Sequence, residues 1–175
     1  MMTTSARAAL AALVLLSLGI GPGAMAADEP AVVTAKAAFD RLKSLEGEWK
    51  SANPGHPEGK VVYKVTAAGT TVMESLGIGT NHEMVTMYHL DGEELKATHY
   101  CAAGNQPHLK LDRKGSKPDF YSFVFDGGTN LNPDKDMHIH AVRFKFLEGG
   151  KVESEWDGYL DGKLANTLKI PMSRP

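Results

Sequence analysis

Four side chains that could carry out chemistry occur as two pairs, with one residue between the members of each pair. His99 and Cys101 form one pair, and His138 and His140 form the other. In a β-strand, side chains at i and i+2 project from the same face, with Cα atoms roughly 6.5–7 Å apart. We therefore expect both members of each pair to face the same side of a sheet, where they could share a ligand.

Three histidines on one inner surface would suit a metal. His99, His138 and His140 could supply three nitrogens and leave a fourth position open, as in catalytic zinc sites. Water in that position would have its pKa lowered toward about 7, which would enable hydrolysis or hydration. The candidate cofactors are zinc or another transition metal, or haem held by one axial histidine in an apolar pocket. The histidines could also act as acids and bases without a metal.

A structural role also explains these residues. Each histidine could hydrogen-bond to a neighbouring hydroxyl or carboxylate, such as Ser154 or Glu74, or line a hydrated opening. Cysteine catalysis is a minor alternative, because His99 and Cys101 would stand side by side on a strand. The loop from Asp126 to Asp136 offers alternating oxygen ligands, but its spacing does not match an EF-hand.

The elements that must position these residues are one helix followed by strands. Apolar residues recur at helical spacing from Thr34 to Leu45, and Gly47 lies where a helix should end. Beyond Gly47 the apolar residues recur at every second position, as in β-strands, and short turn sequences separate these segments. We expect ten strands, which begin near Glu48, Lys60, Thr70, Glu83, Glu94, Pro107, Asp119, Met137, Lys151 and Lys163. The predicted fold is all-β, an antiparallel up-and-down barrel of roughly 8–10 strands with the short N-terminal helix capping one end.

Directly paired residues of a hairpin share a face of the sheet, so the length of each turn predicts which side chains face the barrel interior. A four-residue turn after Leu90 would pair Thr86 with His99, and a two-residue turn would pair Met84 with it; both leave His89 outside. At the later hairpin we expect Val142 opposite Trp156 and His140 opposite Gly158. Leu168, Ile170 and Met172 face inward only if a bulge lies near Gly158. The predicted ligand-binding residues are His99, Cys101, His138, His140, Trp156, Tyr88 and Phe144.

Residues 1–26 have the pattern of a secretory signal peptide. Arg7 precedes an apolar run from Ala8 to Ile20, and Ala24-Met25-Ala26 offers a small-residue cleavage site. The run is too short for a membrane span, which needs about 20 residues. We expect cleavage, a flexible leader over 27–33, a barrel domain over 34–175, and an exported protein, periplasmic or secreted, without a stable membrane anchor.

The length, net charge and cysteine content of the chain argue against several other classes of protein. The chain of 175 residues suits one domain, and a formal net charge of −2 offers no basic surface for nucleic acid. The single cysteine, Cys101, excludes an intramolecular disulfide.

Gly47-Glu48-Trp49, at the point where the helix gives way to the first strand, resembles the Gly-x-Trp signature of lipocalins. The meander resembles the wider calycin group, which includes lipocalins, fatty-acid-binding proteins and nitrobindin-like haem barrels; ten strands are closer to the last. In lipocalins an arginine on a late strand often packs against this tryptophan, and Arg174 is the late candidate here. Segments of 84–107 (MVTMYHLDG and THYCAAGNQP) also resemble uncharacterised exported bacterial proteins.

Three functions remain open. The first is a binding protein that encloses a small apolar or amphipathic molecule, with interior histidines orienting its polar end. The second is a metal- or haem-dependent enzyme, or a histidine acid–base enzyme, that uses His99, His138 and His140. The third is a structural or assembly factor, whose interior would be filled by side chains.

Overall fold

The computed structural model describes residues 32–51 and 59–175. The predicted signal peptide, 1–26, lies outside the described residues. Of the predicted leader, 27–33, only Val32 and Val33 are described, and Val33 is buried against the core. No helix within the two described ranges is long and apolar enough to cross a membrane.

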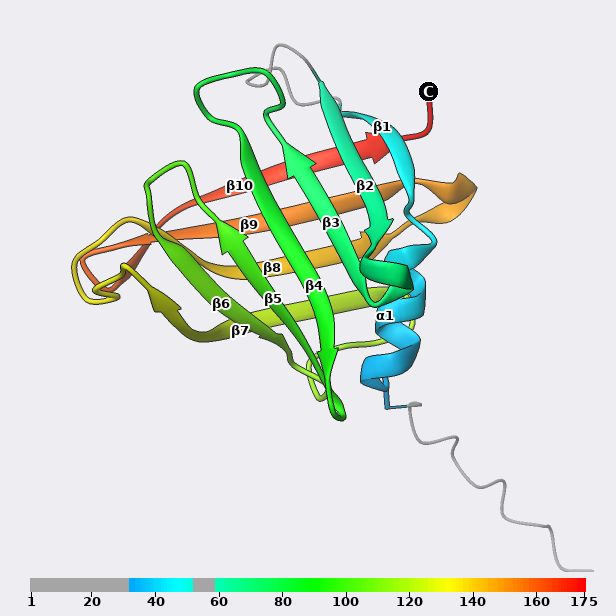
Figure 1. The fold of residues 1–175 in the computed structure, drawn as a ribbon, viewed down its shortest axis with the longest axis horizontal. Helices are drawn as coiled ribbons and strands as arrows, with labels where there is room; N and C mark the ends of the chain where they lie inside the picture. The colour runs from blue at the N-terminus through cyan, green and yellow to red at the C-terminus, as the bar shows by residue number, and fades with distance from the viewer. Residues whose placement is uncertain (1–31, 52–58) are drawn as a thin grey trace, which may run out of the picture.

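The described strands form a closed antiparallel barrel with one short α-helix near the N-terminus (Figure 1). The strands follow one another around the barrel in chain order, and the first pairs with the last. The elements are α1 (Ala35–Lys43), β1 (Gly47–Ser51), β2 (Lys60–Thr66), η1 (Ala67–Gly69), β3 (Thr71–Leu76), β4 (Met84–Asp91), β5 (Glu94–Tyr100), β6 (Gln106–Leu111), β7 (Phe120–Thr129), β8 (His138–Phe146), η2 (Glu148–Gly150), β9 (Val152–Leu160) and β10 (Lys163–Ser173). The predicted fold class is confirmed, and each of the ten strands begins within one residue of its predicted start.

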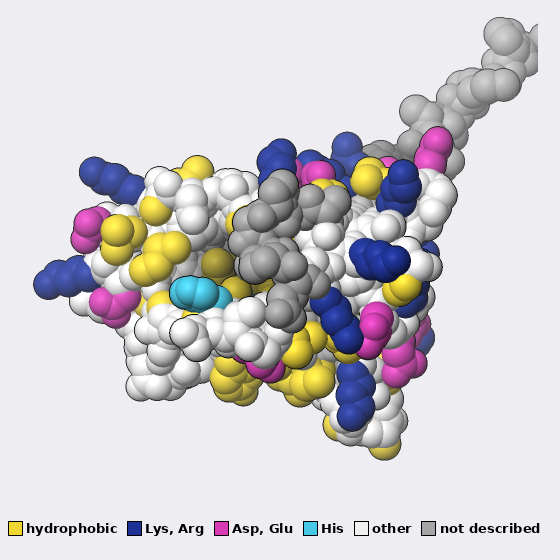
Figure 2. Space-filling view, turned by 90° about the horizontal axis from the view of Figure 1, so that it is seen from above, with side chains coloured by type: hydrophobic (Ala, Val, Ile, Leu, Met, Phe, Trp, Pro, Cys, Tyr) yellow, Lys and Arg dark blue, Asp and Glu magenta, His cyan; other side chains and the backbone are white. Residues whose placement is uncertain are grey.

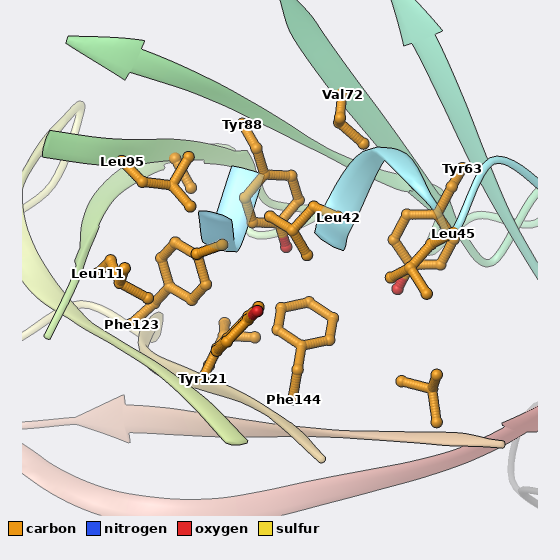
Figure 3. Packing of buried hydrophobic residues seen from close by; sticks show 14 of the residues in the cluster. Leu42, Leu45, Tyr63, Val72, Tyr88, Leu95, Leu111, Tyr121, Phe123 and Phe144 are labelled. Carbon is orange, nitrogen blue, oxygen red and sulfur yellow. The ribbon is translucent and has the colours of Figure 1, made fainter. Parts of the chain in front are cut away.

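Helix α1 has a side-chain cap and one apolar face. The Thr34 hydroxyl accepts a hydrogen bond of 3.1 Å from the backbone N–H of Ala37, which satisfies one of the free donors at the helix start. Ala38, Phe39 and Leu42 are buried on the face toward the barrel. Figure 3 shows Leu42 pointing from α1 toward Tyr88 and Phe144, which lie on opposite walls. The helix therefore covers one end of the barrel, as predicted.

The core occupies the inside of the barrel because inward and outward side chains alternate. In β5, Leu95, Ala97 and His99 are buried, whereas Lys96 and Thr98 are half-buried and Tyr100 is exposed. The opposite wall contributes aromatic side chains such as Phe123 and Phe144, whose ring centroids are 6.2 Å apart in an edge-on arrangement.

A second set of contacts joins the first strand to the last. Arg174, just after β10, lies over the Trp49 ring with its guanidinium carbon 4.2 Å from the ring centroid, and donates a 2.9 Å hydrogen bond to the carbonyl of Glu46. Trp49 donates from its indole nitrogen to the Leu45 carbonyl at 2.7 Å. Gly47 has a φ of +112°, and a Cβ there would come within 2.8 Å of Arg174. The Gly-x-Trp segment therefore contacts the late arginine that the resemblance singled out.

The hairpin registers confirm most of the predicted pairings. Thr86 pairs with His99, which is the register expected of the longer turn, and His89 pairs with Lys96. Val142 pairs with Trp156 as predicted. The predicted pairing of His140 with Gly158 is wrong, because the register of β8 and β9 shifts between Ile139 and Ala141 and places Ile139 opposite Gly158.

The last strand contains the irregularity that its apolar pattern required. The register of β9 and β10 shifts between Leu164 and Asn166, and Asn166 lies opposite Gly158. Beyond this bulge, Leu168, Ile170 and Met172 pair with the inward residues Trp156, Ser154 and Val152.

Candidate functional site

Four neighbouring strands each place one polar side chain at the same level of the barrel. Tyr63 of β2 lies opposite Glu74 of β3, Glu74 lies opposite Thr86 of β4, and Thr86 lies opposite His99 of β5. All four side chains are almost completely buried. Directly paired residues share a face of the sheet, so the four form one continuous polar row inside an otherwise apolar barrel.

Glu74 is held by two tyrosines. The Tyr63 hydroxyl donates to Oε1 and the Tyr88 hydroxyl donates to Oε2, each at 2.6 Å. Burial raises the pKa of Glu74 to about 7, although both hydrogen bonds act to lower it. Among the described residues that are buried there is no lysine or arginine, so Glu74 has no cation beside it in the core.

His99 has one nitrogen occupied and one free. Its Nδ1 lies 2.8 Å from the Thr86 hydroxyl, whereas its Nε2 is buried and has no hydrogen-bond partner in the described part of the chain. The ring faces Trp156 of β9 with 5.2 Å between ring centroids, and Trp156 in turn donates to Ser154 at 3.0 Å. Burial lowers the pKa of His99 to about 4, so the imidazole is neutral at pH 7.

The other two histidines lie together near the start of β8. His138 is fully buried, and its Nδ1 lies 2.8 Å from the backbone carbonyl of Asp136. Its Nε2 lies 3.1 Å from Nδ1 of His140. The His140 ring is stacked between Tyr159, at 3.9 Å, and Phe125, at 4.7 Å. A carbonyl can only accept, so His138 donates from Nδ1, and a neutral His138 ring then accepts at Nε2 from His140.

Most of the predicted ligand-binding residues lie in the barrel interior. His99, Tyr88, Trp156 and Phe144 are buried in the core, and Tyr88 contacts Phe144 edge-on at 6.1 Å. Cys101 is half-buried at the turn after β5, where its sulfur accepts from the Ala103 N–H at 3.5 Å. The interior thus brings the aromatic residues and His99 together, and leaves Cys101 at its edge.

The described side chains do not assemble the predicted metal site. His138 and His140 contact each other, but His99 lies with Thr86 and Trp156. Within residues 32–51 and 59–175, no three His, Cys, Asp or Glu side chains are grouped so that they could hold a metal ion. The expected partners also differ: Ser154 bonds to Trp156 and Glu74 bonds to tyrosines, so neither is the partner of a histidine.

Glu74 is expected from the sequence only as a partner for a histidine, and its hydrogen bonds with Tyr63 and Tyr88 were not predicted. A signal was present, because Val72, Glu74 and Leu76 occupy alternate positions of one strand and all three are buried. A carboxylate at the centre of an apolar alternation is unusual, since acidic side chains are rarely buried without partners. Thr86 could be recognised in the same way, between the apolar positions of β4.

Comparison of this chain with protein-family models, with curated proteins and with solved structures finds no match.

Proposed function

We propose that this barrel binds a small apolar or amphipathic molecule in its interior and holds the polar end of that molecule at Nε2 of His99. The observation that carries the proposal is the buried, unpartnered Nε2. Buried polar atoms are nearly always hydrogen-bonded, because leaving one without a partner costs about 1–3 kcal/mol. A ligand that bonds to Nε2 would remove this cost.

The architecture supports an interior binding site. Eight strands enclose just enough room for side chains or one small ligand, and the diameter grows with strand number, so ten strands enclose more. Helix α1 covers one end. Figure 2, seen from above on the side away from α1, shows hydrophobic side chains gathered in a hollow beside a histidine side chain. Binding sites in barrel mouths combine apolar walls with a few polar groups in this way.

We also propose that the protein is a distant member of the calycin group, and that residues 1–26 direct its export to the periplasm or the exterior. The closed barrel and the contact of Trp49 with Arg174 support the first part. The second part rests on the sequence pattern of the first 26 residues alone.

A haem protein is the second candidate, and it would use the same atom. A neutral imidazole whose Nδ1 is hydrogen-bonded and whose Nε2 is free is the arrangement that an axial ligand requires. When bound, haem would supply redox or gas-binding chemistry. His99 would hold the iron, with Thr86 fixing the orientation of its ring.

The test is titration of the purified chain with retinol, a fluorescent apolar alcohol. The protein is purified from its natural host, so that any removal of residues 1–26 has taken place. We expect saturable binding with transfer of tryptophan excitation to the ligand. His99→Leu should weaken binding about tenfold, because one hydrogen bond of about 1.4 kcal/mol is lost.

His89→Leu is the matched control, because His89 lies on the neighbouring strand β4 and faces the other side of the sheet. It should bind retinol as the wild-type protein does. Absence of saturable binding, or equal losses in the two variants, would contradict the proposal. A Soret band in the purified protein that disappears in His99→Leu would favour the haem candidate.

A further inference from the structure

We infer that the interior ligand is held at two points: one polar group of its head bonds to Nε2 of His99, and a second group, an O–H or N–H donor, bonds to Oδ1 of Asn105. The class of ligand that fits is an apolar chain with a dihydroxy head, such as a glycerol monoalkyl ether. This inference rests on the proposed function, since it adds a second contact and a head-group chemistry to the same site. Two features carry it: the buried oxygen of Asn105, and the position of that residue beside His99.

Asn105 has a buried side-chain oxygen that lacks a donor. The residue is only 4% exposed, and its side-chain nitrogen donates to the backbone carbonyl of Met137 at 2.7 Å. A carbonyl can only accept, so this contact identifies the nitrogen of the amide and leaves the other atom as the oxygen. That oxygen, Oδ1, is buried and has no hydrogen-bond partner among the residues that the structure describes. An amide oxygen only accepts, so the group that satisfies it must supply a hydrogen.

Asn105 and His99 face the same side of one hairpin. β5 and β6 pair at Ala97 with Leu109, and both of these residues are buried in the core. The same register brings Cys101 opposite Asn105, where the Cys101 N–H donates to the Asn105 carbonyl at 3.1 Å. His99 and Asn105 each lie an even number of residues from the buried pair, so both occupy the inward face. Such diagonal neighbours have Cα atoms roughly 7–8 Å apart, a distance that one small head group can bridge.

The two atoms belong to the end of the barrel opposite α1. The helix lies beside the β4–β5 turn, where Lys36 lines a pocket with Gly92 and Glu93. His99 is near the other end of β5, and Asn105 closes the β5–β6 turn, which lies away from α1 (Figure 1). A ligand whose tail extends through the apolar core toward α1 therefore has its head between these two residues.

Hydroxyl groups suit both positions. A hydroxyl can donate to Oδ1 of Asn105, and it can either donate to Nε2 of His99 or accept from it, so the second bond forms whichever ring nitrogen carries the proton. A dihydroxy head brings one hydroxyl to each atom, whereas a simple alcohol has one hydroxyl for both. A buried polar atom left unpaired weakens binding, because it has given up hydrogen bonds to water without gaining another. The site should therefore favour the dihydroxy head.

Two ligands with the same tail test the inference. Glycerol monododecyl ether, which has a hydroxyl on each of two neighbouring carbons, and dodecanol, which has a single hydroxyl, are titrated against the retinol complex. We expect the ether to displace retinol at concentrations about tenfold lower than dodecanol does, because it forms one more buried hydrogen bond. This comparison needs only the wild-type protein. If the two ligands displace retinol equally well, the inference is overturned and interior binding stands.

Asn105→Leu tests the second contact. Leucine has a similar size and no acceptor, so this variant should lose the preference for the ether and bind dodecanol as the wild-type protein does. Gln106→Leu is the matched control, because Gln106 is the next residue of β6, occupies the alternate face and bonds to Asn130. It should keep the preference. A purely structural effect of Asn105→Leu would weaken both ligands equally and preserve their ratio, and that result would overturn the assigned role of Asn105.

The outcomes separate this inference from the proposed function. If neither retinol nor either of the two dodecyl ligands binds, the proposed function fails and this inference fails with it. If retinol binds and the ether has no advantage over dodecanol, only the inference fails. Far-ultraviolet circular dichroism verifies that each variant has folded. Should Asn105→Leu fail to fold, the comparison of the two ligands on the wild-type protein still decides the inference.

Discussion

Glu74 and His99 respond to pH in opposite directions. Burial raises the pKa of Glu74 from 4.5 to about 7 and lowers the pKa of His99 from 6.5 to about 4. Between about pH 4.5 and 6.5, folded Glu74 keeps a proton that the unfolded chain has lost, so its contribution to stability falls as pH rises. Over the same interval the unfolded chain holds a proton that folded His99 lacks, so the contribution of His99 rises. The contributions of Glu74 and His99 to stability therefore change with pH in opposite directions.

Replacing either residue should remove its contribution, so that the free energy of unfolding of the variant follows the pH dependence of the other residue. We expect the free energy of unfolding of Glu74→Gln, relative to the wild-type protein, to rise with pH from about 4.5 to 7, at up to about 1.4 kcal/mol per pH unit. His99→Gln should show the opposite sign between about pH 4 and 6.5. Urea denaturation at half-unit steps of pH measures both. A difference from wild type that is the same at every pH would contradict the assigned pKa shifts.

At the scale of elements, α1 is held by its apolar face more than by its exposed ion pair. Leu42 is fully buried inside the end of the barrel, whereas Lys36 is exposed and forms an ion pair with Asp40 on the same helix. Removing a buried leucine side chain loses its transfer free energy and leaves a cavity. An exposed i, i+4 ion pair contributes little, because both charges are well hydrated.

Leu42→Ala should therefore lower the free energy of unfolding by about 2–5 kcal/mol. Lys36→Ala, on the same helix, should change it by less than about 0.5 kcal/mol. Urea denaturation followed by tryptophan fluorescence compares the two variants with the wild-type protein. Similar small effects in both would mean that α1 does not stabilise the barrel.

The strands could be predicted from the sequence because alternation is a local property. Lys60 to Thr66 and Glu94 to Tyr100 alternate cleanly, and each has one face to bury, so their bounds and registers follow from pattern and turn length. The shift of register between β8 and β9 near His140 could not be predicted, because nothing in His138-Ile139-His140 distinguishes a regular strand from one with an extra residue. A single added residue shifts the register of every residue beyond it by one position.

The site was predictable only in part for a related reason. That His99 and Trp156 face inward follows from parity, but their contact across the barrel depends on how β5 and β9 cross the interior, which is set by closure and strand tilt. The same geometry separates His99 from His138 and His140. Three inward residues on one sheet are therefore a weaker prediction of a metal site than three ligands on one short segment.

At the scale of the whole molecule, the closure of the barrel depends on its shortest contact. β1 and β10 pair at Lys50 with Ser173 and at Ser51 with Met172, whereas β9 and β10 pair along most of their length. Arg174 reinforces this closure through its contacts with Trp49 and Glu46. Local opening should begin where the fewest backbone hydrogen bonds must break.

We expect Arg174→Ala to increase hydrogen exchange in β1 and in the last residues of β10 at least tenfold, while β4 and β5 exchange as in the wild-type protein. Lys163→Ala, at the exposed start of β10, is the control and should leave all four strands unchanged. Mass spectrometry of peptic fragments resolves these regions. A uniform increase across the barrel would show that Arg174 contributes to global stability and not to closure alone.

The join between β1 and β10 also determines when the protein can first become a barrel. The Arg174–Glu46 hydrogen bond connects residues 128 positions apart, and β10 is the last of the described strands to leave the ribosome. Until then the nascent chain is an open sheet with two bare edges, which is the form of a β-protein that self-associates most readily. Productive biogenesis therefore requires that those edges be shielded, or kept dilute, for as long as translation of the preceding strands takes.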